Sequence, residues 1–207
     1  MLSRWIRAWD SIFLRPFILL IAGLGVTPNA LTICSLAFSI MAGVMLFANQ
    51  LQLGGLSLLV GGLLDGLDGE LARSTGHQTN LGAFLDSICD HLGDFAVALG
   101  IATLYLSRGS SGEVLLVLAA LFGSLFGSQV RSRAGMLGLD LKNVGIATRF
   151  ERNLVLILGS FLNAMPVALW ILALLNNLTA LQRTVHATRA MIAQQKSQAG
   201  PRRGVTR

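Results

Sequence analysis

The amino-acid sequence predicts an all-α integral membrane protein, with six transmembrane helices preceded by an interfacial amphipathic helix. Of its 207 residues, 53% are hydrophobic and only 13% are charged, whereas soluble domains have about 25% charged residues. Apolar segments that approach the roughly 20 residues needed to cross a bilayer also recur along the chain. The expected spans cover residues 28–48, 51–73, 81–106, 113–137, 150–164 and 166–188, and the last two are the least clearly separated.

The segments on either side of the spans have a different character. Thr27 and Pro28 are a typical start for the first span, as an N-cap followed by proline at the first helical position. Before it, residues 3–24 are expected to form the interfacial helix, because apolar residues recur there at helical spacing among arginines. Residues 191–207 are expected to be a basic, disordered tail, so the membrane domain is expected to cover residues 1–190. The apolar residues of the interfacial helix are Trp5, Ile6, Trp9, Ile12 and Phe13.

The distribution of positive charge predicts the topology. In a six-span arrangement nearly all Lys and Arg residues fall on one side, and Arg108 alone lies opposite. The positive-inside rule makes that side cytoplasmic, which places both termini there in a cell membrane protein. The net charge of +6 is therefore explained by topology, and we expect no nucleic-acid partner. Cys34 and Cys89 lie in apolar stretches and predict no disulfide framework.

The acidic residues are concentrated in one region. Six of the ten lie between residues 63 and 94, although a carboxylate at bilayer depth costs about 2.5–3.5 kcal/mol. Two pairs, spaced by three and by four residues, each share a helix face, and adjacent antiparallel helices would bring the pairs together. Four converging carboxylates would repel each other unless cations lay between them, and hard oxygen ligands suit two Mg²⁺, Mn²⁺ or Ca²⁺ ions. These four are Asp65, Asp68, Asp86 and Asp90.

Other interpretations of the same residues stay open. Each aspartate could instead pair with an arginine or cap a helix. Glu70 and Asp94 lie near the four aspartates and could support them. An ion-coupled transporter would also place carboxylates in the membrane, but it would spread them over several spans and depths. A structural membrane protein with an incidental acidic patch is a third alternative. We assign no role to His77, His91 and His186.

The aspartates belong to a longer pattern, D-G-L-D-G-E-L-A-R followed after eight residues by G-A-F-L-D-S-I-C-D. This pattern resembles the signature of the CDP-alcohol phosphatidyltransferase family, D-x2-D-G-x2-A-R-x8-G-x3-D-x3-D. The family has an interfacial N-terminal helix, six spans and a site that faces the cytoplasm, and its members are often homodimers. The eight fixed positions are filled by Asp65, Asp68, Gly69, Ala72, Arg73, Gly82, Asp86 and Asp90.

The resemblance implies a role for each position. The four aspartates would bind two divalent ions, Mg²⁺ or Mn²⁺, and Asp90 would also be the general base. The CDP group would be held by Asp68, Gly69, Ala72, Arg73 and Gly82. The implied reaction transfers a phosphatidyl group from CDP-diacylglycerol to the hydroxyl group of an acceptor and releases CMP, with metals stabilising the leaving group.

A second basic set, made of five arginines in the later part of the chain, indicates which kind of alcohol is the acceptor. A phosphorylated alcohol would need such cations more than serine or a neutral alcohol would. The segments around these residues resemble the later spans of bacterial phosphatidylinositol-phosphate synthases. That resemblance assigns the acceptor phosphate to Arg152 and Arg183, and to Arg131 where those enzymes carry a lysine. Inositol phosphate is therefore the expected acceptor, with glycerol 3-phosphate or serine as alternatives and topology alone as the competing reason for the arginines. The set comprises Arg131, Arg133, Arg149, Arg152 and Arg183.

Overall fold

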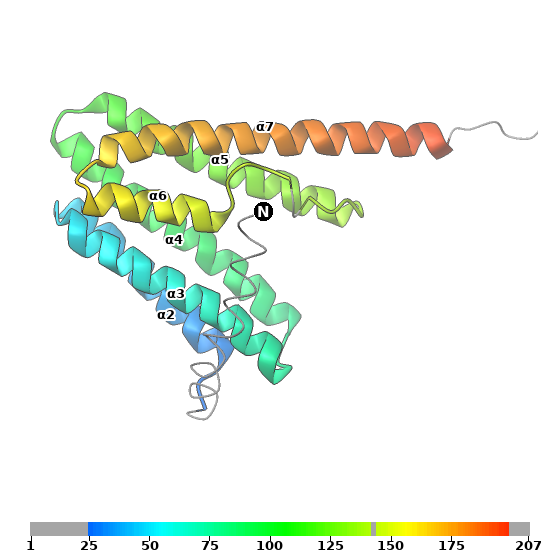
Figure 1. The fold of residues 1–207 in the computed structure, drawn as a ribbon, viewed down its shortest axis with the longest axis horizontal. Coiled ribbons are helices and arrows are strands. Elements are labelled where there is room, and N and C mark those ends of the chain that lie inside the picture. The colour runs from blue at the N-terminus through cyan, green and yellow to red at the C-terminus, as the bar shows by residue number, and fades with distance from the viewer. Residues whose placement is uncertain (1–24, 142–143, 199–207) are drawn as a thin grey trace, which may run out of the picture.

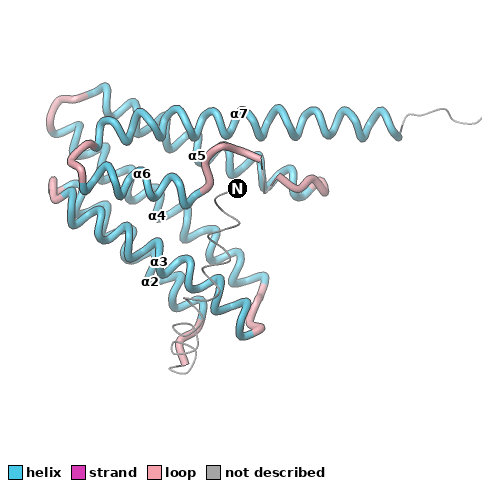
Figure 2. The backbone as a smooth tube through the Cα atoms, viewed as in Figure 1, coloured by secondary structure: helices cyan, strands magenta, loops and turns pink. Residues whose placement is uncertain are grey.

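The structure is a computed structural model that describes residues 25–141 and 144–198, with side chains to residue 195. The expected interfacial helix and the last nine residues lie outside the described part of the chain. Within it, the chain is helical with short connections (Figures 1 and 2). The helices are α2 Pro28–Phe47, α3 Leu51–Thr75, α4 Asn80–Ser107, α5 Ser111–Met136, α6 Arg149–Phe161 and α7 Met165–Gln198.

Local sequence signals explain where the helices begin and end. Thr27 accepts a hydrogen bond from the Ala30 amide at 3.3 Å, and Pro28 follows at the first helical position. Thr79 caps α4 in the same way, accepting from the Gly82 amide at 3.0 Å. Gly76 has a φ of +69°, the left-handed conformation that glycine favours after a helix. Helices α2 to α6 therefore end within about three residues of the predicted spans.

Helix α7 differs from the prediction at its C-terminal end. It continues to Gln198, so residues 191–198 are helical, where we expected an irregular tail. Alanine, methionine, glutamine and lysine favour helix in this stretch. Ala187 and Met191 also pack against Ala134 and Leu141, so the helix is supported beyond the predicted span. At 34 residues, α7 is about 51 Å long and projects beyond the other helices (Figure 1).

The described helices form a closed ring. Helix α2 packs on α3 and α4, α3 on α6, α6 on α7, α7 on α5, and α5 on α4. Small residues allow two of these approaches, because a Cβ atom on Gly100 would collide with the backbone of Gly43, and one on Gly123 would lie 2.7 Å from the Asn177 amide nitrogen. In Figure 1, α2 and α3 diverge from α5 and α7, and α6 lies between them.

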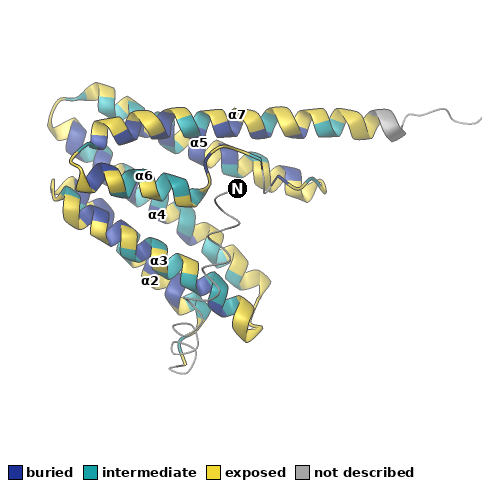
Figure 3. Ribbon diagram, in the orientation of Figure 1, coloured by how far each residue is buried: buried dark blue, intermediate teal, exposed yellow. Residues whose placement is uncertain are grey.

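The outer surface is that of a membrane protein. Exposed residues cover the outward faces of the helices in Figure 3, and many of them are large and apolar, among them Leu118, Phe122 and Phe126 on α5. In the described part of the chain, α2, α4, α5 and α7 are long and apolar enough to cross a bilayer. Helix α6, with 13 residues, is only about 20 Å long, and α3 carries charged residues near its end. The expected number of six crossings therefore remains a prediction.

Candidate metal and phosphate site

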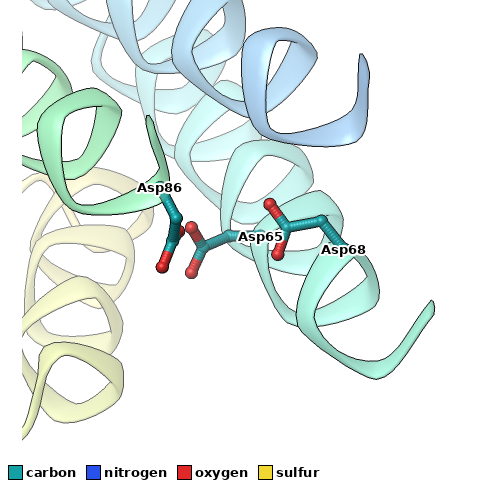
Figure 4. Close-up of side chains that lie close together, drawn as sticks. All are labelled: Asp65, Asp68 and Asp86. Carbon is teal, nitrogen blue, oxygen red and sulfur yellow. The ribbon is translucent and has the colours of Figure 1, made fainter. Parts of the chain in front are cut away.

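Three of the predicted aspartates meet at the ends of α3 and α4. Asp65, Asp68 and Asp86 each offer one carboxylate oxygen, and these oxygens lie within 4.8 Å of one another (Figure 4). We had expected these two helices to pack directly on each other. In the described part of the chain they do not, and both pack on α2 instead. Three carboxylate oxygens at this spacing fit a hard divalent cation, the kind of ion that prefers all-oxygen ligands.

Helix α2 orients the most buried of these aspartates. The side chain of Thr32 donates a hydrogen bond to Asp68 at 2.5 Å, and Asp68 is only 6% exposed. Asp65 and Asp86 are half-buried. A buried carboxylate with a fixed hydrogen-bond partner presents its other oxygen in a defined direction, as second-shell partners of metal ligands do. Thr32 was not among the predicted site residues. A polar residue one turn into the first apolar span was the feature that could have indicated it.

Asp90 is held beside the other three aspartates by an arginine. Arg149 at the start of α6 donates from Nη1 to Asp65 at 2.8 Å and from the same nitrogen to Asp90. Asp90 is therefore not among the three clustered carboxylates but is linked to them through a guanidinium group. Arg149 belonged to the second basic set, and we assigned it no role of its own. The structure makes it the cation of the aspartate site.

A cavity of about 260 Å³ lies against the same ends of α2, α3 and α4. Its lining includes every residue that the resemblance assigns to CDP. A Cβ atom on Gly82 would lie 3.3 Å from the Asn29 side chain, so glycine keeps this wall open. The guanidinium of Arg73 pairs with Glu70 at 2.7 Å and is largely exposed. The predicted lining residues are Asp68, Gly69, Ala72, Arg73 and Gly82, and His77, to which we gave no role, also lines this cavity.

The three predicted acceptor arginines come from three helices. Arg152 of α6 lies 3.4 Å from Asp94 of α4, which also accepts a hydrogen bond from Ser124. Arg183 of α7 is 7% exposed and donates to backbone carbonyl groups on α5 and in the α5–α6 connection. Arg131 of α5 lies close enough to interact electrostatically with both. The structure thus brings together cations that are up to 52 positions apart in the sequence.

A central cavity of about 70 Å³ links the two groups of charged residues. All the described helices contribute to its lining, which contains the charged residues Asp65, Asp94, Arg149 and Arg152. Asn176 of α7 also lines it, is 6% exposed, and has a buried carbonyl oxygen without a hydrogen-bond partner. Charged side chains inside a ring of apolar helices are typical of a functional site in a membrane protein.

Comparison with known proteins agrees with this arrangement. The CDP-alcohol phosphatidyltransferase family matches residues 25–174. The chain is 36% identical to an archaetidylinositol phosphate synthase of Pyrococcus horikoshii, over 83% of this chain and 88% of that protein. It is also 36% identical to a phosphatidylinositol phosphate synthase of Mycolicibacterium smegmatis, over 80% of this chain and 78% of that protein.

Solved structures with the same fold are also known. The Mycobacterium tuberculosis phosphatidylinositol phosphate synthase with CDP-DAG bound matches with a TM-score of 0.75 at 27% identity, covering 83% of this chain and 92% of that one. A structure of the same enzyme with manganese and citrate matches with a TM-score of 0.72 at 29% identity, over 83% and 87%. These findings define a membrane-embedded transferase fold. The chain belongs to the CDP-alcohol phosphatidyltransferase family, which confirms the resemblance seen in the sequence.

Proposed function

We propose that this protein transfers the phosphatidyl group of CDP-diacylglycerol to inositol phosphate and releases CMP. The observation that carries the proposal is the central cavity, whose lining contains Asp65 of the family signature together with Arg152. An enzyme that joins a nucleotide-linked lipid to a phosphorylated alcohol needs both kinds of charge at one place. Two relatives, named archaetidylinositol phosphate synthase and phosphatidylinositol phosphate synthase, support this acceptor.

The aspartates would bind the metal and remove a proton. Asp65, Asp68 and Asp86 have the geometry to hold a divalent ion, and a relative crystallised with manganese supports Mg²⁺ or Mn²⁺ as the cofactor. When bound, two such ions would neutralise the pyrophosphate and stabilise CMP as the leaving group. Asp90, which faces the same site across Arg149, would accept the proton of the attacking hydroxyl group.

The 260 Å³ cavity would receive the nucleotide. Gly69, Ala72 and Gly82 have side chains too small to block it, and Asp68 connects it to the metal site. Arg73 would contact a phosphate from the rim, since it is largely exposed, its partner Glu70 belongs to the same helix, and such a pair is weak. The relative solved with CDP-DAG bound supports this ligand.

The acceptor phosphate would be bound by Arg131, Arg152 and Arg183. Arg183 donates to carbonyl groups through Nε and Nη1, so its Nη2 group is left for a phosphate oxygen. Arg152 is held only by the 3.4 Å contact with Asp94 among the described residues, and can turn toward an anion in the cavity. Guanidinium groups suit this task because they bind phosphate through two parallel hydrogen bonds.

The placement in the cell is part of the same proposal. The positive-inside distribution supports a multi-pass cell membrane protein with both termini and the site on the cytoplasmic face, where water-soluble nucleotide and acceptor are available. The family resemblance supports a homodimer.

The proposal is tested by following CMP release from CDP-diacylglycerol by the purified protein with Mg²⁺ or Mn²⁺. Inositol phosphate, glycerol 3-phosphate, serine and free inositol are offered separately, and Asp90→Asn serves as the inactive control. Release that depends on inositol phosphate and is lost in the variant is the expected result. Release with glycerol 3-phosphate or serine instead would reassign the acceptor, and failure to bind CDP-diacylglycerol would contradict the proposed chemistry.

A further inference from the structure

The contacts of Arg149 indicate a role for this residue that the family signature does not contain. It stands at the first position of α6, where Thr148 and Glu151 form a capping box that fixes the start of the helix. In the described part of the chain α6 packs on α3 and α7 but not on α4. The guanidinium group of Arg149 nevertheless reaches Asp90 of α4, so it extends into the space that the ring encloses.

The ion pairs that Arg149 makes are incomplete for an arginine. A single nitrogen, Nη1, serves both Asp65 and Asp90, while Nε is buried and has no partner. Arginine binds a carboxylate most strongly through two parallel hydrogen bonds, and that arrangement is not formed here. A single donor atom between two carboxylate oxygens instead occupies the place that a bridging cation would take.

We propose that Arg149 is a resident cation that occupies the position between Asp65 and Asp90, and that the second divalent ion must displace it. The inference deepens the proposed function and rests on it for the use of two ions. The first ion binds where Asp65, Asp68 and Asp86 already converge. The second binds more weakly, because it competes with a positive charge that is already paired with its ligands.

The central cavity can receive the displaced guanidinium group of Arg149. Arg149 and Arg152 lie one turn apart on α6, and both line the central cavity. A guanidinium group that leaves Asp65 and Asp90 remains in this cavity, where it faces the phosphates of the substrates beside Arg152. The exchange therefore makes Arg149 a positioning residue: it leaves Asp65 and Asp90 to the second ion and moves its own charge toward the substrate phosphates.

The experiment measures Mn²⁺ binding to the purified full-length protein in detergent, without substrates, by the electron paramagnetic resonance signal of free Mn²⁺ and by calorimetry. The wild type is expected to bind one ion tightly and a second at least about tenfold more weakly. In Arg149→Gln the second ion should bind on the order of tenfold more tightly, and Arg149→Lys should restore most of the difference. Arg133→Gln, which removes an exposed charge from α5, is the matched control and should bind like the wild type.

Thermal unfolding provides a readout that does not depend on counting ions. Arg149→Gln leaves Asp65 and Asp90 without their cation, so its melting temperature should be lower without metal and should rise more on adding Mn²⁺ than that of the wild type. Equal affinities for the two ions in the wild type, or an Arg149→Gln variant with unchanged or weaker second binding, would overturn the inference. A wild type that binds no Mn²⁺ would instead overturn the metal requirement of the proposed function.

Discussion

The two halves of the candidate site are built in different ways. The aspartates and the nucleotide cavity come from α3, α4 and the beginning of α2, and their key residues fall within the 26 positions from Asp65 to Asp90. The acceptor arginines come from α5, α6 and α7 and are spread over the 53 positions from Arg131 to Arg183. The first half is a short pattern in the sequence, whereas the second exists only after the helices have packed.

The partners of the charged residues differ as well. Carboxylates face other carboxylates in the first half, which requires cations, so this half is specialised for metal. In the second half, Arg183 is held by backbone carbonyl groups and Arg152 contacts Asp94, so these two arginines have protein partners before any ligand arrives. The proposed function therefore assigns the chemistry common to the family to the compact half and the choice of acceptor to the dispersed half.

The largest expected effect of a substitution lies in the compact half. Asp68→Asn removes a charge that belongs both to the carboxylate cluster and to the nucleotide cavity. CMP release should fall by about a thousandfold or more, because a metal ligand that stabilises the transition state is lost. Glu113→Gln, at the start of α5, is the control and should keep full activity. Substantial activity in Asp68→Asn would contradict the assignment of the metal-dependent chemistry to the compact half.

An intermediate effect is expected in the dispersed half. Arg152→Gln should raise the KM for inositol phosphate about 10- to 100-fold, since one charge-assisted phosphate contact is lost, while the KM for CDP-diacylglycerol stays within about twofold. Steady-state kinetics with each substrate varied in turn measures both values. A rise in the KM for CDP-diacylglycerol alone would assign Arg152 to the nucleotide side. It would contradict the assignment of the acceptor to the dispersed half.

A smaller effect is expected where α2 supports the compact half. Thr32→Val keeps the shape of the side chain but removes the 2.5 Å hydrogen bond to Asp68. The affinity for Mn²⁺ should fall about tenfold, the lower end of what partners of metal ligands contribute. Thr103→Val is a matched control, because that hydroxyl group bonds the Leu99 carbonyl of its own helix. Equal Mn²⁺ affinity in both variants would show that Thr32 does not orient Asp68.

The smallest effect concerns the packing that both halves share. Gly100→Ala would force α2 and α4 apart, because the new Cβ atom would collide with the Gly43 carbonyl. The free energy of unfolding should fall by about 1–3 kcal/mol, read as a lower midpoint of thermal unfolding in detergent. Gly112→Ala, where nothing lies within 4 Å of the new methyl group, should leave the midpoint unchanged or slightly higher.

The difference between the halves also explains what the sequence could predict. Hydrophobic segments and the Thr27 cap predicted helix ends close to those observed. Asp68 and Gly82, which the signature assigns to one ligand, line the same cavity, since they lie close together in the sequence on consecutive helices. The sequence could not show that α2 separates α3 from α4, because helix packing depends on contacts between distant segments.

Arg149 illustrates the same limit in the site. Several arginines lie near the connection between α5 and α6, and positive-inside topology accounts for all of them equally well. Only the packing of α6 on α3 carries this one to Asp65 and Asp90. Likewise, the contacts of Ala187 and Met191 with Ala134 and Leu141 support α7 beyond its predicted span and could not be predicted from local composition.

The most direct test of the account is to identify the lipid product by mass spectrometry when all acceptors compete. The purified protein is given CDP-diacylglycerol and Mg²⁺ with equal concentrations of inositol phosphate, glycerol 3-phosphate and serine. The account predicts phosphatidylinositol phosphate as the main lipid product, absent with Asp90→Asn and reduced with Arg152→Gln. A product that carries glycerol phosphate or serine, or an unchanged product mixture in Arg152→Gln, would contradict it.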